Sequence, residues 1–241
     1  MEKRAIIILS FLVGCLMPDA LIDLKIIRPG FAQPETSPSW SSVNRIGLMP
    51  FVKGKYGAQM EESLNCTVCL LLNDPRDLES NSDFILTRYT QKALEKRLGE
   101  KVIPLQEAME VHERIPRDDF NDSPKTLAQK LGSALHAELM ILGNVWKYRE
   151  RVGGSRGVSQ PASVSFAIYM IEVDSGKLLW KEVFSETQSS LAENTLNFKV
   201  FFERGSRWLS ADELALFGVN EVFMKFPYGN RNLPSQPSQE E

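Results

Sequence analysis

The sequence predicts a single α/β domain, an α+β sandwich with a mixed sheet, a C-proximal antiparallel three-stranded meander and helices packed mainly on one face. The meander is predicted by apolar residues that alternate with polar ones from Glu138 to Thr187, on both sides of a short turn at Asp174 to Lys177. Amphipathic helical segments come before this stretch and after it. A chain of 241 residues, 43% of them apolar, is long enough for one sizeable core and too short for two.

Five strands are expected, at residues 45–51, 101–105, 138–148, 163–173 and 178–184. Pro50 ends the first strand or places it at a sheet edge, because proline cannot donate a ladder hydrogen bond. The third strand contains LMILGNVW, which is apolar enough for a central strand buried on both faces. Both faces of the fourth strand are partly apolar. We therefore expect helices on one side of the sheet, and a partner or the chain's own tail on the other.

Helices are expected at residues 83–98, 106–112, 124–135 and 210–225. Ser82 or Asp83 is the expected N-cap of the first helix, and Gly99 is its expected stop. Pro124 suits the first position of the third helix, since its fixed backbone angle is already helical. Ser210 begins a capping box at the start of the last helix.

The N-terminus carries a short basic segment, then an apolar run from Ala5 to Gly14, then Cys15. The run has the length of an export signal and is too short to span a bilayer. The sequence Leu12-Val13-Gly14-Cys15 resembles the bacterial lipobox, which implies that residues 1–14 are removed and that Cys15 is diacylated. Two alternatives stay open: cleavage near Ala32, which would give a soluble periplasmic protein, and an uncleaved anchor.

Composition divides the chain into four parts. Residues 1–14 are the predicted lipoprotein signal peptide, residues 15–42 a flexible Pro-rich tether, residues 43–227 the domain and residues 228–241 a disordered polar tail. The net charge of −3 argues against a protein that binds nucleic acid through its overall field. No apolar run reaches the roughly 18 residues that a membrane-spanning helix needs.

Cys66 and Cys69 form a CxxC pair in a segment punctuated by Gly, Asn and Pro. A structural disulfide is the favoured interpretation, because the predicted envelope location is oxidising. Free thiols, a redox dithiol and half of a metal site stay open as alternatives. A zinc site would need a second compact ligand pair, whereas His112 and His136 lie far apart in the sequence.

Three further segments are candidate contact surfaces. The long Gly- and Arg-rich connection between the first two meander strands presents Arg149, Arg151 and Arg156, as a plain hairpin or as a contact for a partner or lipid headgroup. It lacks the Lys-Ser/Thr of a P-loop. A second segment is strongly apolar for a connection and contains Phe198, Phe201 and Phe202. The helix at 83–98 has a basic face, for which solvent is the favoured surrounding and lipid headgroups are the alternative.

The order of elements resembles the domain of a group of bacterial envelope lipoproteins that includes the curli-secretion lipoprotein CsgG, the penicillin-binding-protein activator LpoB and the N-terminal domain of TolB. The resemblance rests on the first strand with its Pro-Phe pair, the helix at 83–98, the Gly143-Asn144-Val145 strand, and the turn from Asp174 to Trp180. It implies an α/β domain that binds protein partners. No long amphipathic hairpins of the kind used by the curli pore are present, so a pore is not expected.

The sequence therefore predicts a lipid-anchored, non-enzymatic protein on the periplasmic face of a bacterial outer membrane. It would bind an envelope protein partner and assist assembly, secretion or cell-wall synthesis. No cofactor, metal or catalytic residue is expected, since GxSxG, HExxH and P-loop motifs are missing from the sequence. Two alternatives stay open: a subunit of a homo-oligomeric envelope or export complex, and an enzyme built from dispersed carboxylates such as Glu150 with Asp174, or from the cysteine pair.

Overall fold

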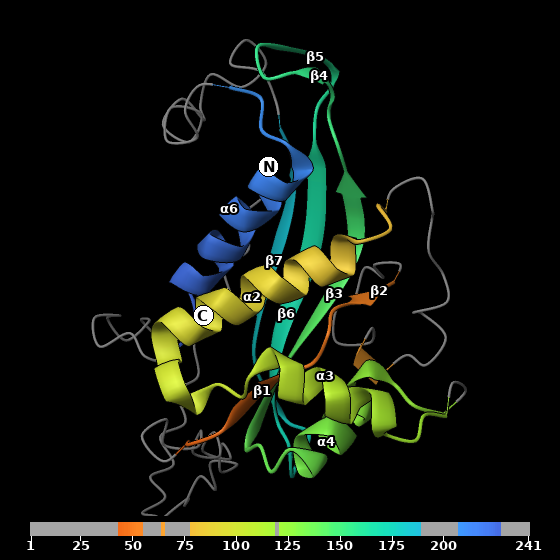
Figure 1. Ribbon diagram of the computed structural model, residues 1–241, viewed down its shortest axis with the longest axis vertical. Helices are drawn as coiled ribbons and strands as arrows, with labels where there is room; N and C mark the ends of the chain where they lie inside the picture. The colour runs from red at the N-terminus through yellow and green to blue at the C-terminus, as the bar shows by residue number, and fades with distance from the viewer. Residues whose placement is uncertain (1–42, 55–63, 66–77, 119–120, 189–206, 228–241) are drawn as a thin grey trace, which may run out of the picture. The chain divides into compact units, whose positions relative to one another are not determined.

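The computed structural model describes residues 43–54, 64–65, 78–118, 121–188 and 207–227 (Figure 1). All of them lie within the compact unit Ser37–Glu241. Within these ranges, no helix combines the length and the apolar character that crossing a membrane requires.

The sheet is mixed, and its strands follow the order β1-β3-β6-β7. Both short strands at the start of the domain run parallel to β3, whereas β3, β6 and β7 pair antiparallel as the predicted meander. The bounds are β1 Ile46–Leu48, β2 Val52–Lys53, β3 Leu139–Arg149, β6 Ser163–Glu172 and β7 Leu178–Thr187. Pro50 separates β1 from β2, which agrees with its expected role as a strand end. The predicted mixed sheet with a meander is confirmed.

The strand predicted at Lys101 to Leu105 is wrong. Val102 forms only an isolated bridge with Ile46, and η2, a 3-10 helix at Gly99–Lys101, precedes it. Pro104 lacks the N–H that would continue a ladder, and it stands as N-cap of the helix that follows. The apolar run is therefore too short to extend the sheet beyond one contact.

Among the described residues, α-helices of ten or more residues pack on the sheet at α2 Ser82–Leu98, α3 Leu105–Arg114, α4 Pro124–Ala134 and α6 Ala211–Met224. The cap at Ser210 forms as predicted, and Ser123 caps α4 ahead of Pro124; each serine accepts from a backbone N–H three residues on. Gly99 ends α2 with a φ of 57°, which a glycine adopts without strain. Ser82 is not the N-cap of α2: Asn81 is, without a side-chain cap, and the Ser82 hydroxyl donates to the Glu79 carbonyl.

Two hydrophobic clusters lie on opposite faces of the sheet, and the α+β sandwich is confirmed. The longer helices α2 and α6 pack side by side on one face, where Ile141, Phe166 and Phe184 form the cluster with them (Figure 1). The shorter helices α3 and α4 cover the other face around Met140 and Tyr169. The sequence led us to expect helices mainly on one face and a partner or the chain's own tail on the other. In the structure, α3 and α4 cover part of that second face, so the helices are divided more evenly between the two faces.

Candidate binding site

A two-stranded hairpin, β4 Val152–Gly154 and β5 Gly157–Gln160, extends beyond the hydrogen-bonded ends of β3 and β6 (Figure 1). Residues 152–157 are all exposed, and Val152 is 54% exposed. Gly153 has a φ of 123°, and a Cβ there would lie 2.6 Å from the carbonyl oxygen of Gly157. Glycine is therefore required for this tight pairing, and the exposed hairpin carries Val152 at its base and Arg156 at its turn.

The base of the hairpin is fixed to the start of α6 by Glu150. Its Oε2 accepts from the backbone N–H of Ala211 at 2.8 Å, while its own N–H donates to Oε1 of Glu79 at 3.1 Å. A carboxylate at a helix N-terminus satisfies a free N–H and interacts favourably with the helix dipole. The hairpin, the segment before α2 and α6 are thus joined at one point.

Arg151 forms the second link between the hairpin and the segment before α6. Its Nη1 donates to the carbonyl of Trp208 at 2.5 Å and lies 3.9 Å from the Glu213 carboxylate. The Trp208 N–H donates in turn to the carbonyl of Ser155, and only 19% of the Arg151 side chain is exposed. The guanidinium of Arg151 therefore holds the hairpin in place, which differs from the contact role expected for it.

The other two predicted arginines have different surroundings. Arg156 is exposed at the turn between β4 and β5. Arg149, the last residue of β3, is half-buried and has an interaction partner within the molecule. Of the three, Arg156 is thus the residue placed to meet a ligand directly, at the turn of the hairpin whose base carries the exposed Val152.

Acidic and phenolic groups gather where α6 begins, beneath the hairpin. The buried Tyr148 hydroxyl donates to Oδ1 of Asp212 at 2.5 Å. Burial and this hydrogen bond raise the pKa of Tyr148 well above its usual range. Burial also raises the pKa of Glu79, and burial together with Asp212 raises that of Tyr89. Tyr148 and Glu79 are thus held by hydrogen bonds where the base of the hairpin meets the start of α6.

Glu150 and Asp174, the dispersed carboxylate pair considered above, do not share a site. Glu150 follows Arg149, which pairs with Ser163 at one end of β6, whereas Asp174 follows the other end of that strand. At about 3.3 Å per residue, the ten-residue strand puts them roughly 30 Å apart. This pair is therefore wrong as an enzyme site.

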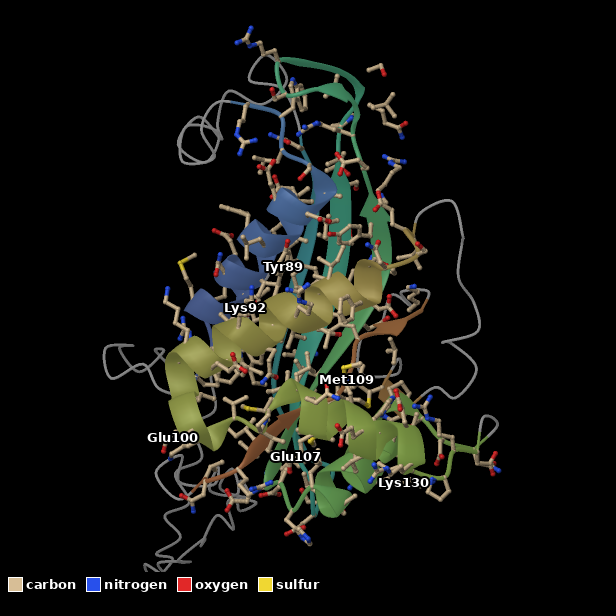
Figure 2. All side chains as sticks on the ribbon, in the orientation of Figure 1. Tyr89, Lys92, Glu100, Glu107, Met109 and Lys130 are labelled. Carbon is tan, nitrogen blue, oxygen red and sulfur yellow. The ribbon has the colours of Figure 1, made fainter. Side chains whose placement is uncertain are left out.

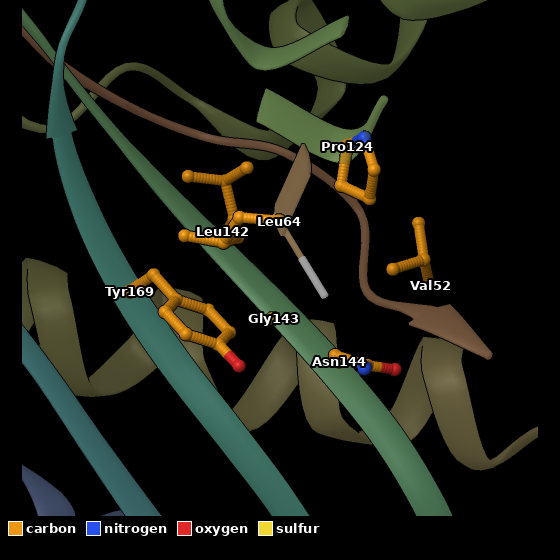
Figure 3. Close-up of a pocket in the computed structure, with 7 residues that line it drawn as sticks. All are labelled: Val52, Leu64, Pro124, Leu142, Gly143, Asn144 and Tyr169. Carbon is orange, nitrogen blue, oxygen red and sulfur yellow. The ribbon is translucent and has the colours of Figure 1, made fainter. Parts of the chain in front are cut away.

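A small cavity lies between β3, β6 and the start of α4 (Figure 3). It has a volume of about 10 Å³ and is lined by Val52, Leu64, Pro124, Leu142, Gly143, Asn144 and Tyr169. Asn144 is 8% exposed, and its side-chain oxygen accepts no hydrogen bond from the described residues. The volume matches about one water molecule and is too small for a substrate.

Several predicted site residues lie outside the described ranges: Cys15, Cys66, Cys69, Phe198, Phe201 and Phe202. Lipidation, the disulfide and the aromatic contact surface stay predictions. In the part of the chain that is described, no group of three or more His, Cys, Asp or Glu residues is arranged to hold a metal ion.

No family model matches the chain, and no curated protein matches it either. Similar solved structures include the PelC dodecamer from Paraburkholderia phytofirmans, at 11% identity over 78% of this chain and 90% of that one, with a TM-score of 0.43. Lipoprotein GNA1162 from Neisseria meningitidis is 14% identical over 68% of this chain and 94% of its own chain, with a TM-score of 0.41. LpoB from Escherichia coli is 11% identical over 78% of this chain and 87% of its own chain, with a TM-score of 0.35. At these scores, no activity, partner or residue role is carried over from those proteins.

Proposed function

We propose that the protein is a lipid-anchored, non-enzymatic protein of the bacterial cell envelope that binds a protein partner through the β4–β5 hairpin. In this role it assists envelope assembly, secretion or cell-wall synthesis. The observation that carries the proposal is the hairpin itself, exposed at its tip and held at its base by Glu150 and Arg151. An arm that is already ordered loses little conformational entropy when it binds.

The position of the hairpin relative to the entry of the proposed tether supports this role. Ile46, near the first described residue, pairs with Leu139 at the start of β3. The hairpin follows Arg149 at the other end of this 11-residue strand, about 33 Å away at 3.3 Å per residue. A domain held at the Ile46 end by a lipid on Cys15 therefore keeps its hairpin free for a partner in the periplasm.

The chemistry of the exposed hairpin fits a protein surface with an apolar contact and an acidic neighbour. Val152 supplies exposed apolar area, and Arg156 supplies a cation on the connecting turn. Arginine is enriched in protein interfaces because its planar fork binds carboxylates through two hydrogen bonds.

Site-specific photo-crosslinking in native envelopes tests the hairpin. A photoreactive amino acid at Ser155 is expected to trap a discrete partner, whereas the same group at the exposed Glu113 of α3 is not. Val152→Asp together with Arg156→Glu should abolish the Ser155 product. Equal products at both positions, or a product that survives the double substitution, would refute the role of the hairpin. A product that consists of two copies of this chain would instead favour the homo-oligomeric subunit.

Metabolic labelling with a fatty acid tests the anchor separately. The wild-type protein should incorporate palmitate, and Cys15→Ser should not. Equal labelling of both proteins would contradict Cys15 as the lipidated residue, and no labelling of either would contradict the lipid anchor and agree with the soluble periplasmic alternative.

A further inference from the structure

The outward face of α2 carries four residues spaced by four positions: Phe84, Arg88, Lys92 and Lys96. All four are exposed, and Phe84 is 49% exposed although it is large and apolar. Residues four apart lie above one another on a helix, so these side chains form one continuous strip along α2. Figure 2 labels Lys92 on this helix. We call these four residues the α2 strip.

The cations of the α2 strip are not neutralised by carboxylates. Arg88 lies over the ring of Phe84, 5.7 Å from its centre, and within the described residues neither Lys92 nor Lys96 forms an ion pair. The stretch from Arg88 to Lys101 contains five Lys or Arg and two Glu, although the whole chain has a net charge of −3. This stretch thus has a net positive charge, whereas the net charge of the whole chain is negative.

The carboxylates near the same end of the sheet lie elsewhere. Glu138, Glu172 and Asp174 line a groove of about 650 Å³ beside the end of α4, which covers the opposite face of the sheet from α2. The α2 strip itself contains no carboxylate and presents a cationic surface, while the acidic groove shares Val43 with the end of the domain that adjoins Lys101.

The proposed tether enters the domain at the C-terminal end of α2. Lys101, just after this helix, donates its Nζ to the carbonyl of Val43 at 2.7 Å. Val43 is buried in the same cluster as Leu98 and Val102. Any anchor that precedes residue 43 therefore attaches the domain beside the lysine-bearing end of α2.

We propose that the α2 strip binds the anionic phospholipid headgroups of the membrane to which the domain is tethered. The inference rests on the proposed lipid anchor, because proximity raises the local concentration of headgroups. If residues 15–42 form the predicted tether, a flexible chain of that length has a root-mean-square span of about 30 Å, short enough for a domain surface to reach the bilayer. Each Lys or Arg near an anionic surface strengthens binding about fivefold. Phe84 provides an apolar side chain on the same surface.

The test uses the mature chain from residue 15 with Cys15→Ser, so that no lipid contributes to binding. Partition of this protein into vesicles of phosphatidylcholine with phosphatidylglycerol is compared with partition into phosphatidylcholine alone. We expect binding to the anionic vesicles only, and its loss at high salt, because screening weakens exposed charge interactions.

A matched pair of variants locates the surface. Arg88→Gln, Lys92→Gln and Lys96→Gln together should weaken partition by roughly 100-fold, the combined effect of three such residues. The control carries Lys125→Gln, Lys147→Gln and Lys181→Gln, which remove the same charge from α4, β3 and β7. We expect its partition to stay within about twofold of the parent protein, since those lysines lie away from α2.

Equal weakening in both variants, or equal binding to neutral vesicles, would overturn the α2 strip as the lipid site. Far-UV circular dichroism and thermal melting of the variants separate lost binding from lost folding. The anchor and the strip fail independently. If the wild-type protein is labelled with palmitate but its lipid-free form does not bind anionic vesicles, only this inference is refuted. If the lipid-free form binds anionic vesicles but the wild-type protein is not labelled, only the anchor is refuted.

Discussion

The close contact between Gly143 and Phe51 gives the sharpest test of how the sheet is packed. A Cβ on residue 143 would lie 2.2, 2.2 and 2.3 Å from three ring carbons of Phe51, whereas non-bonded carbons prefer about 3.5–4.0 Å. The ring has little room to retreat. Phe51 is 3% exposed, stands edge-on to Phe166 at 6.2 Å, and its backbone N–H donates to the Thr87 hydroxyl.

We expect Gly143→Ala to lower the free energy of unfolding by about 2 kcal/mol. Overpacking costs typically about 1–3 kcal/mol, and three overlaps of more than 1 Å place this site near the upper end. Removing a strand glycine returns about 0.5–1 kcal/mol, which reduces the net loss without reversing it. Urea unfolding followed by circular dichroism measures the difference. A variant as stable as the parent would show that the contact is not as tight as its geometry implies.

Two further variants separate this steric effect from a general sensitivity to alanine. A Cβ added at Gly154 in the hairpin would meet no atom within 4 Å, so Gly154→Ala should change stability by less than about 0.5 kcal/mol. Phe51→Ala alone should cost about 3–5 kcal/mol. In the double variant of Phe51 and Gly143, the new methyl group occupies space that the ring has vacated, so the combined loss should be about 3 kcal/mol smaller than the sum, the steric cost alone. Strict additivity would refute the proposed contact.

Three other predictions concern the polar groups. Ser210→Ala should cost about 1 kcal/mol in urea unfolding, because the cap of α6 is lost; no change would contradict the capping box. Tyr148→Phe should also cost about 1 kcal/mol, since its partner Asp212 is exposed and regains water; a gain in stability would contradict the hydrogen bond. Burial lowers the pKa of His112 to about 4 in the folded chain. Between about pH 6.5 and 4, His112 is therefore protonated in the unfolded chain but neutral in the folded chain. Stability should fall as pH falls through this window, and less so in His112→Gln; parallel pH profiles would refute the assignment.

Features that depend on residues close in sequence were predicted well. Ser210 caps α6 and Gly99 ends α2, because each acts on backbone groups within a few positions, although the N-cap of α2 is Asn81 and not the expected Ser82 or Asp83. The strand at Lys101 to Leu105 failed because pairing is decided by a distant segment, and Pro104 limits what that segment can accept. Local chemistry thus fixes the ends of helices more firmly than it fixes membership of a sheet.

The candidate site shows the same limit. The sequence predicted that the Gly- and Arg-rich connection is an exposed hairpin. It also led us to expect Arg151 as a contact residue for a partner or headgroup. Arg151 binds Trp208, 57 positions later, and Glu150 binds Ala211, 61 positions later. No local motif signals such partners. Phe51 and Gly143, both in motifs that carry the family resemblance, similarly meet only in the folded chain, which gives these motifs a role in packing.

The two proposed surfaces can be tested against each other, because the turn of the hairpin and the lysine end of the α2 strip lie in different parts of the fold. The hairpin follows Arg149, whereas the lysine end of α2 adjoins Val43, beside the opposite end of β3. That strand spans about 33 Å, more than three Debye lengths at physiological salt, so the charges act separately. Arg156→Glu should therefore remove crosslinking at the hairpin and leave vesicle binding intact, and Lys96→Gln should weaken only vesicle binding. If either substitution impaired both measurements, one surface would have to serve both ligands, and the assignment of membrane and partner to opposite ends would be wrong.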